Sequence, residues 1–449
     1  MMGHQPQSSR KLFYTKFNLD KRIRKDHLLR KVDEHIHFDF IYQAVEDKYG
    51  NRGNVSIPPP VILKMMLLLI LYNVRSEREL MDTIPERLDW LWFLGYDLDD
   101  EIPNHSVLSK ARTRWGVEAF RTFFERIVSQ CVEAGLVDGR KLFMDASLIQ
   151  ANASNNSVVR RADLDKGYAV LESRLEREAD SCDDNDPPKS GTANRKHIST
   201  TDPDASICRH SKGESKLQYK VHRGVDDRCE IITATQVTPA EVHDAHRLAS
   251  LIDRHQSITN NTVTCCVADK KYGTIKNYLT CHDLGIKPHI SPLEKSHRSR
   301  GRQKGIFAKE VFSYDPISDT FTCPEGQKLQ KRNYYKKREK YEYKASSEVC
   351  ASCQLRRKCT RARDGRTLKR HVRQEDLDKM LKIASSAEAE KDIKERQHLV
   401  ERSFARGTRY GFKRARWRRL WRVRIQEYLT AAVQNLMVLL KYVKEAALA

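Results

Sequence analysis

The sequence predicts an α/β fold, with a mixed sheet flanked by helices. An all-helical part precedes it, so the chain as a whole is α+β. Two patterns predict this class. Apolar residues recur at helical spacing through residues 1–135, and short apolar runs then alternate with helical segments through residues 136–294. A third observation is a basic, cysteine-containing insertion at residues 295–372, after which helices return at residues 373–449. We therefore expect four parts with these boundaries.

Start signals and apolar faces define the helices of the N-terminal part. Three consecutive prolines, residues 58–60, precede a strongly apolar run, and Ser76 with Glu79 three residues later forms a capping box. The spacing predicts helices over residues 28–40, 61–72, 107–115 and 120–134.

The central part alternates between strand-like and helix-like segments, which favours a mixed sheet. Two of its apolar strands end in an acid: Asp145 follows Leu142-Phe143-Met144, and Asp269 ends the run 263–268. We expect strands at 141–149, 217–221, 231–237, 263–268 and 286–290. We expect helices at 240–252, 272–281, 374–405 and 427–443.

Composition narrows the class of function. Lys and Arg number 82 against 60 Asp and Glu, a formal net charge of +22, which predicts an anionic partner such as nucleic acid. The most apolar run, residues 61–72, is too short for a membrane span of about 20 residues, so we expect no membrane partner. The N-terminus shows no secretory signal, and the 11 cysteines are an odd number. These features predict a reducing, cytoplasmic location without a disulfide framework.

Three carboxylates are the candidate catalytic residues. Asp145 and Asp269 end two core strands, where α/β sheets place ligands, and Glu401 lies on the predicted long helix. Carboxylates that gather at one point repel one another unless a cation joins them, and Mg²⁺ prefers such oxygen ligands. The alternative for each acid alone is an ordinary turn former or helix N-cap.

Ordered motifs around these acids resemble the DDE transposases of bacterial insertion sequences. The first acidic motif is Leu142-Phe143-Met144-Asp145, the second is Ala268-Asp269-Lys270-Lys271-Tyr272, and the third is Val400-Glu401-Arg402-Ser403-Phe404. Linking motifs around Asp202, Tyr219 and Val242 and the N-terminal helices are similar too, so the resemblance covers roughly residues 15–445. The nearest branch is the insertion-sequence family numbered eleven eighty-two.

The resemblance implies a ribonuclease-H-like core with the first acid on the first strand and the second on the fourth. It implies Asp145, Asp269 and Glu401 as ligands of two Mg²⁺ ions, for which Mn²⁺ can substitute. It also implies cleavage of double-stranded DNA at terminal inverted repeats and strand transfer into target DNA, by a homodimer in the active complex.

A basic tract, residues 402–424, is the candidate DNA contact. It has ten Lys or Arg, no acid and interleaved aromatics, a composition suited to gripping phosphates and stacking on bases. Family members often carry basic residues near the third acid, where Gln397 and Thr408 stand here with Arg396 and Arg409 beside them. The alternative is a solvated basic face. The expected DNA-binding residues are Arg396, Arg402, Arg406, Arg409, Lys413, Arg414, Arg416, Arg418 and Arg419.

Four cysteines of the insertion are candidate zinc ligands. Cys350 and Cys353 have chelate spacing, Cys359 follows, and Cys323 begins a knuckle-like Cys-Pro-Glu-Gly turn. Four thiolates suit tetrahedral Zn²⁺. A segment with little apolar content needs such a bound metal to stabilise its fold. The alternative is a set of reduced, unliganded thiols.

The function hypothesis is a Mg²⁺-dependent transposase that cleaves element ends and joins the 3′-hydroxyl to target DNA. One alternative is a catalytically silent DNA-binding protein derived from such an enzyme, which an intact acidic trio disfavours. Another is a zinc-stapled RNA-binding protein, which explains the charge and the cysteines but not acids at two strand ends.

Overall fold

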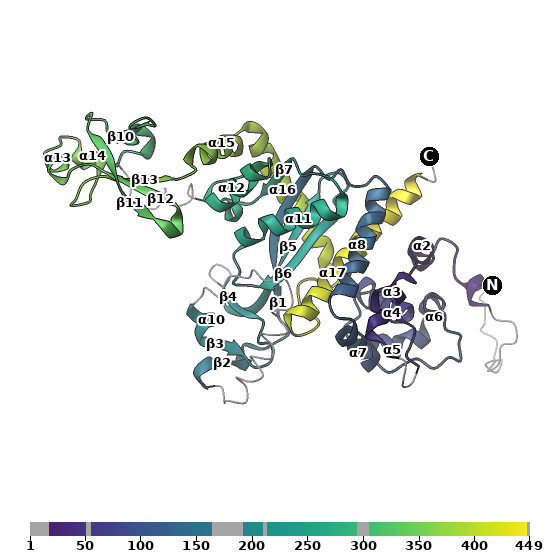
Figure 1. Ribbon diagram of the computed structural model, residues 1–449. Coiled ribbons are helices and arrows are strands. Elements are labelled where there is room, and N and C mark those ends of the chain that lie inside the picture. The colour runs from purple at the N-terminus through teal and green to yellow at the C-terminus, as the bar shows by residue number, and fades with distance from the viewer. Residues whose placement is uncertain (1–17, 51–54, 164–191, 210–212, 294–304, 447–449) are drawn as a thin grey trace, which may run out of the picture.

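The computed structural model describes residues 18–50, 55–163, 192–209, 213–293 and 305–446 (Figure 1). The molecule is elongated, with the N-terminal helices at one end, a six-stranded sheet in the middle and a second, five-stranded sheet at the other end. Among the described helices, none combines the length and apolar content that a membrane span requires.

The N-terminal part is helical, as predicted. Ser76 Oγ accepts a hydrogen bond from the Glu79 N–H at 3.1 Å, so the capping box forms. The single helix predicted over residues 28–40 is wrong: the chain makes two short helices there, separated by residues 36–39. The helices are α1 (Leu19–Arg22), α2 (Leu28–His35), α3 (Phe40–Val45), α4 (Pro59–Leu71), α5 (Glu77–Thr83), α6 (Leu88–Leu94), α7 (Ser106–Trp115) and α8 (Glu118–Glu133).

The central sheet is mixed. Its strand order is β4-β5-β1-β7-β8, with β6 paired to the other part of β5. Strand β1 runs parallel to β7, and β7 parallel to β8, whereas β5 is antiparallel to β1, β4 and β6. The strands are β1 (Lys141–Gln150), β4 (Ser206–Arg209), β5 (Ser215–Asp226), β6 (Ile232–Pro239), β7 (Cys265–Ala268) and β8 (Lys287–Ile290). Leaving the short β4 aside, β7 is the fourth strand of this sheet, which is where the second acid was expected.

Helices cover both faces of this sheet, and strand alternation decides which side chain meets which helix. Leu142 and Met144 of β1 pack in the cluster formed by α11, α12 and α15, while Phe143 packs on the opposite face with α16 and α17. The helices are α11 (Leu248–Thr259), α12 (Ile275–Asp283), α15 (Gln374–Ala384), α16 (Ala387–Thr408) and α17 (Leu420–Ala446). Asp145, two residues after Phe143, therefore lies on the α16 face.

Helix α17 joins the N-terminal helices to the sheet. One buried cluster runs from α2 and α4 through α17, including Leu429, Val433 and Leu436, to Phe143 and Val225 of the sheet. The two parts predicted on either side of residue 135 therefore share a continuous apolar core.

Three boundaries in the second half differ from the predictions. The helix predicted at 374–405 is two helices, because Ser386 begins α16 and its side chain accepts from the Ala389 N–H. The last helix begins at Leu420, within the basic tract, because its first turns pack against β6 and the N-terminal helices. The segment predicted as a helix from 240 starts with a 3₁₀ turn, Asp244–Arg247, and α11 follows.

The insertion has a sheet and a small core of its own. Its strand order is β13-β12-β11-β10-β9, antiparallel throughout, and Phe312, Phe321 and Tyr343 pack inside it. Its elements are β9 (Ser313–Asp315), β10 (Thr320–Thr322), β11 (Lys328–Tyr335), β12 (Lys340–Lys344), α13 (Ser347–Ala351), α14 (Arg356–Cys359) and β13 (Thr367–His371). A small lobe beside the central sheet holds β2 (Val158–Arg160), α10 (Thr192–Lys196) and β3 (His197–Ser199).

Candidate active site

Asp145 and Asp269 lie on neighbouring parallel strands. The register pairs Met144 of β1 with Ala268 of β7, so the next residue on each strand is an acid. Both follow apolar residues of the same face, Phe143 and Val267, by two positions, so both side chains project on the α16 face. Each acid is half-buried. The sheet thus brings together two acids that are far apart in sequence.

An arginine of α16 neutralises the first acid. Arg396 Nη1 donates to Asp145 Oδ2 at 2.6 Å, and the Ala146 N–H donates to Asp145 Oδ1 at 2.8 Å. The Asp145 side chain is 24% exposed and that of Arg396 is 11% exposed. Burial raises the pKa of Asp145, and the charge of Asp269 adds to the rise, against the opposing effects of Arg396 and the Ala146 N–H.

Asp269 has a structural role as well as its place beside Asp145. It is the N-cap of the 3₁₀ turn Lys270–Tyr272, and its Oδ1 accepts from the Lys271 N–H at 3.0 Å. The N-cap alternative considered for an isolated acid is therefore true of Asp269, but it does not exclude ligation, because the second carboxylate oxygen has no hydrogen-bond partner among the described residues.

Further charged residues surround the acid pair, and they were not among the site residues expected from the sequence. Buried Asp244 forms ion pairs with Lys220 at 2.7 Å and Lys271 at 3.3 Å. Burial alone would raise the pKa of Asp244, but the charge and hydrogen bond of Lys220 hold it below its usual value. Lys220 and Asp244 belong to the linking motifs of the sequence, which were the signal that could have identified them.

The charges of this cluster act on the buried hydroxyl of Tyr272. The hydroxyl has no hydrogen-bond partner among the described residues. Burial raises the pKa of Tyr272, followed by the charges of Asp244, Asp145 and Asp269. The phenol therefore stays protonated and can donate a hydrogen bond.

Glu401 lies on the exposed side of α16. It follows Arg396 by five residues, which corresponds to about 140° around the helix axis and about 7.5 Å along it. Among the described residues, no hydrogen bond or ion pair holds its carboxylate, and no three of the acids have oxygens that all lie within 4.8 Å of one another. The structure brings Asp145 and Asp269 together and places Glu401 on the helix that covers them.

Two family models match the chain. One is described as "Transposase domain (DUF772)" and matches residues 17–114, and the other is described as "Transposase DDE domain" and matches residues 322–440. These two matches support a DDE transposase of an insertion element. The second match contains Glu401 and the basic tract, whereas Asp145 and Asp269 lie between the two matched spans. No curated protein and no solved structure matches the chain.

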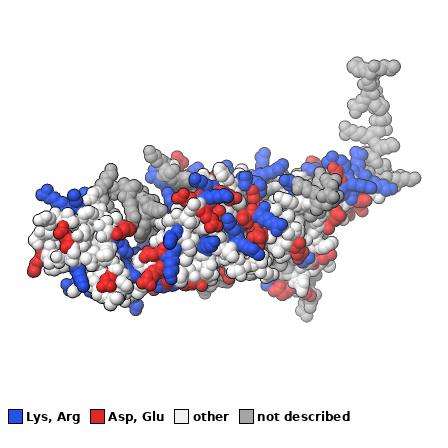
Figure 2. Space-filling model, turned by 90° about the horizontal axis from the view of Figure 1, so that it is seen from above, with Lys and Arg blue, Asp and Glu red and all other residues white. Residues whose placement is uncertain are grey.

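The basic tract runs beside the end of the strand that carries the first acid. The Gln150 N–H donates to the Lys413 carbonyl at 3.0 Å, and the Ala415 N–H donates to the Gln150 carbonyl at 2.8 Å. Figure 2 shows one face of the whole molecule, over which Lys and Arg are spread with acids between them. Four exposed cations of the tract make no ion pair with an acid that the structure describes: Arg409, Lys413, Arg414 and Arg418.

The remaining arginines of the expected DNA-binding set have protein partners. Arg402 and Arg406 both form ion pairs with Glu230, at 2.5 and 2.7 Å. Arg416 donates to the Val74 carbonyl and to the Asn73 side chain, so it ties the tract to the N-terminal helices. Arg419 is held through its backbone, because its N–H donates to Asp202 at 2.9 Å, while its Nη1 is buried without a hydrogen-bond partner among the described residues. Sequence reasoning could not separate these residues from the exposed ones, because their partners lie far away in the chain.

Three of the candidate zinc ligands lie near enough to the fourth, Cys359, for their charges to act on it. Burial raises the pKa of the Cys359 thiol, and Cys350, Cys323 and Cys353 each add to the rise through their charges. The turn that begins at Cys323 closes with hydrogen bonds from the Cys323 N–H to Gln327 and from the Gly326 N–H to Cys323. No three of these sulfurs all lie within 4.8 Å of one another.

One buried group of the described residues does meet that distance: Cys265, His289 and Asp392. His289 Nδ1 lies 2.6 Å from Asp392, and the Lys141 ammonium lies 3.1 Å from the same carboxylate. Because Lys141 already supplies a cation there, the group serves as an anchor that holds α16 against β1, β7 and β8.

Proposed function

We propose that this transposase cleaves double-stranded DNA at the terminal inverted repeats of its element and joins the freed 3′-hydroxyl to target DNA. The observation that carries the proposal is the pair of acids at adjacent positions of β1 and β7, on the face covered by the helix with the third acid. In the reaction, water opens the phosphodiester at the element end, and the 3′-hydroxyl then attacks a target phosphodiester.

The donor set at this point suits a hard divalent cation. Asp145 and Asp269 supply carboxylate oxygens, and Glu401 is the third candidate ligand, which fits two Mg²⁺ or Mn²⁺ ions. When bound, such ions activate water and stabilise negative charge on the phosphate. The donor chemistry fits, and the Arg396 guanidinium shows that Asp145 attracts a cation.

Arg396 has two states in this proposal. In the structure it neutralises Asp145, which would otherwise be an unpaired half-buried charge. If Asp145 held a metal ion, the guanidinium would be free to bind a DNA phosphate, the role that the sequence predicted for it. The same change leaves the helix in place, because Asp392 holds α16 to the sheet through Lys141 and His289.

DNA lies along the exposed cations Arg409, Lys413, Arg414 and Arg418 in this proposal, next to the end of β1. The N-terminal helices, residues 1–135, recognise the inverted repeats, and a homodimer pairs the two ends. The insertion, residues 295–372, is stapled by Zn²⁺ on Cys323, Cys350, Cys353 and Cys359. This proposal places the reaction in the bacterial cytoplasm, where the element DNA lies.

Nicking of an inverted-repeat duplex tests the function. The wild type should nick in Mg²⁺ or Mn²⁺ and not in a chelator, and Asp145→Asn and Asp269→Asn should lose about 10²–10³ in rate or more. Asp253→Asn, an exposed acid on α11, is the matched control and should nick normally. A wild type that binds the duplex but never nicks would support the silent DNA-binding alternative instead.

A further inference from the structure

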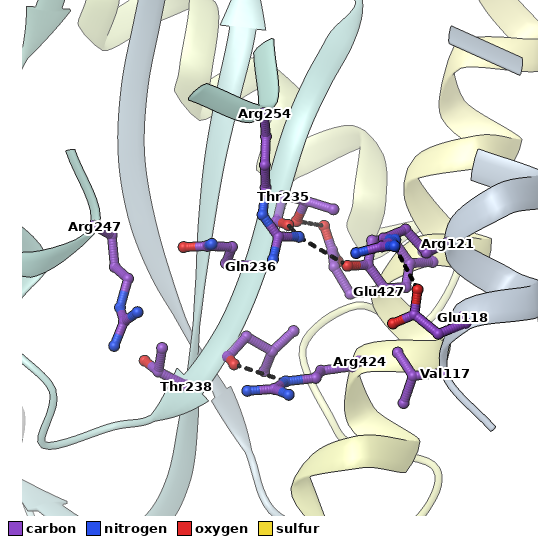
Figure 3. Close-up of a pocket in the computed structure, with 12 residues that line it drawn as sticks. Val117, Glu118, Arg121, Thr235, Gln236, Thr238, Arg247, Arg254, Arg424 and Glu427 are labelled. Carbon is purple, nitrogen blue, oxygen red and sulfur yellow. Dashed lines mark hydrogen bonds and ion pairs between the residues drawn. The ribbon is translucent and has the colours of Figure 1, made fainter. Parts of the chain in front are cut away.

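Four arginines line a cavity at the edge of the central sheet, on the side of β5 away from β1. The cavity has a volume of about 110 Å³ and lies between the edge strand β6, the first turn of α8 and the first turns of α17 (Figure 3). That volume equals about three to four water molecules at roughly 30 Å³ each. Its arginines come from four separate elements: Arg121 from α8, Arg247 from the 3₁₀ turn before α11, Arg254 from α11 and Arg424 from α17.

The lining carries a surplus of positive charge. Its two acids are Glu118 and Glu427, against four arginines. Glu427 is committed to Arg223, which reaches its two oxygens at 2.7 and 3.0 Å. Arg121 pairs with Glu118 at 2.5 Å and with Glu125, which lies outside the lining, at 3.6 Å. Arg424 has no acid within ion-pair distance among the described residues, and its Nε donates only a long, 3.4 Å hydrogen bond to the Val237 carbonyl. An anion would therefore be favoured in this cavity.

Backbone N–H groups at the cavity also favour an anion. Among the described strands, β6 pairs only with β5, so alternate residues of β6 turn their N–H and C=O groups outward. The carbonyls of Thr235 and Val237 accept from Arg254 and Arg424, which shows that these two residues face the cavity with their N–H groups as well. The N-terminal end of α8 adds its own unpaired N–H groups and the positive end of the helix dipole.

We propose that this cavity binds a phosphate group. Donors that converge from four elements suit a tetrahedral anion, whose oxygens point in several directions, better than a planar carboxylate. The group belongs to a DNA backbone or to a free phosphate or nucleotide, since both present the same oxygens. This inference rests on the proposed function only for the DNA source.

The cavity lies between the N-terminal helices and the central part. Its walls combine α8, from the helices proposed to recognise the element ends, with β6 and α17 of the central part. A DNA phosphate held there would contact both parts at once and fix the bound end relative to the sheet.

Inorganic phosphate is the first probe. Thermal unfolding of the full-length chain is followed while phosphate replaces chloride at constant ionic strength, and the wild type should unfold at higher temperature. Arg424→Gln, and separately Arg254→Gln, should raise the half-saturating phosphate concentration about tenfold or more, because each removes a charge-assisted hydrogen bond. Arg126→Gln is the matched control: it lies on α8 over the Phe40 ring and outside the cavity lining.

DNA binding is the second arm and separates the two sources. With a DNA phosphate in the cavity, Arg424→Gln should flatten the slope of log affinity against log salt by about 0.9, relative to Arg126→Gln. Loss of phosphate binding with an unchanged slope would assign the cavity to a free phosphate or nucleotide. The site would be overturned if phosphate does not raise the unfolding temperature of the wild type. It would also be overturned if both arginine variants respond to phosphate as strongly as the wild type. A wild type that binds phosphate but no DNA would defeat the proposed function and leave this site standing.

Discussion

Arg396 Nη1 donates a 2.6 Å hydrogen bond to Asp145 Oδ2, across 251 positions of sequence. The pair places a cation against the first acid of a carboxylate couple whose second member, Asp269, follows the neighbouring strand. Helix and sheet are therefore linked at the point where the chemistry is proposed to occur.

Arg396→Gln should destabilise the chain by about 1–3 kcal/mol near neutral pH, because Asp145 would lose its counter-charge in a half-buried position. Asp145→Asn should destabilise the chain less, since burial disfavours the charged carboxylate and the amide oxygen still accepts from Arg396, which loses only its counter-charge. Urea unfolding of both single variants and the double variant, in chelator, measures the coupling. If the change in unfolding free energy of the double variant equals the sum of the two single changes, the ion pair does not contribute to stability as argued.

Glu401→Gln should separate DNA binding from chemistry. The change keeps size and helix propensity while removing a negative charge and a metal-binding oxygen, so nicking should fall about 10²–10³-fold or more. Gel-shift affinity for the same duplex should stay equal or rise slightly, because a charge that repels phosphate is lost. Glu395→Gln, also exposed on α16, is the control. Normal nicking by the Glu401 variant with loss in the Glu395 variant would move the third acid to Glu395.

Replacing Arg409, Lys413, Arg414 and Arg418 together by Gln should flatten the salt dependence of DNA affinity. The expected change in slope is about 0.9 per lost phosphate contact, up to ~3.6 in total. Arg416→Gln should leave the slope unchanged and lower the unfolding temperature, since Arg416 joins the tract to Asn73 and Val74. An unaltered slope in the fourfold variant would mean that the tract is a solvated face.

Purified protein should contain about one zinc ion per chain if the four cysteines of the insertion act as a staple. Cys350→Ser with Cys353→Ser should lose the metal and make residues 305–372 sensitive to protease. Cys208→Ser, on β4 of the central sheet, should keep both the metal and the resistance. A zinc-free wild type whose insertion resists protease would remove zinc from the proposal.

Because of Asp202, the free energy of unfolding should fall as pH rises from about 4 to 6. Burial raises its pKa to about 6, while Tyr219 and the Arg419 N–H both donate to one of its oxygens and the other has no partner among the described residues. The folded state then binds more protons than the unfolded state in this window, so stability falls as pH rises, by at most ~3 kcal/mol. Unfolding free energies of Asp202→Asn should be flatter across the window. Asp253→Asn should retain the wild-type slope.

Local pattern was sufficient for the strands that carry the acids. The run 141–149 and the run 263–268 were predicted as strands, and β1 and β7 occupy them within two residues at each end. Short apolar runs bounded by polar residues fix both the strand and its phase, so Asp145 and Asp269 were predictable as strand-end acids. The capping box at Ser76 was predictable for the same reason, because all its atoms lie within one turn.

Local pattern failed where a residue's partner is distant in sequence. Nothing near Arg416 indicates that it contacts Asn73, and nothing near Arg396 indicates that it binds Asp145. The start of α17 was placed seven residues late because its first turns look like solvated basic chain until β6 and the N-terminal helices cover them.

The sequence by itself determined the class of the sheet, the two strand-end acids and the basic character of the surface, since periodicity and charge are properties of neighbouring residues. Only the tertiary structure decided which cations stay exposed, which pair with protein acids, and which four arginines meet around a cavity at β6. The reason is physical: a guanidinium on a long side chain finds whichever acceptor the packing of helices and strands brings within reach, and that packing is set by buried apolar contacts elsewhere in the chain.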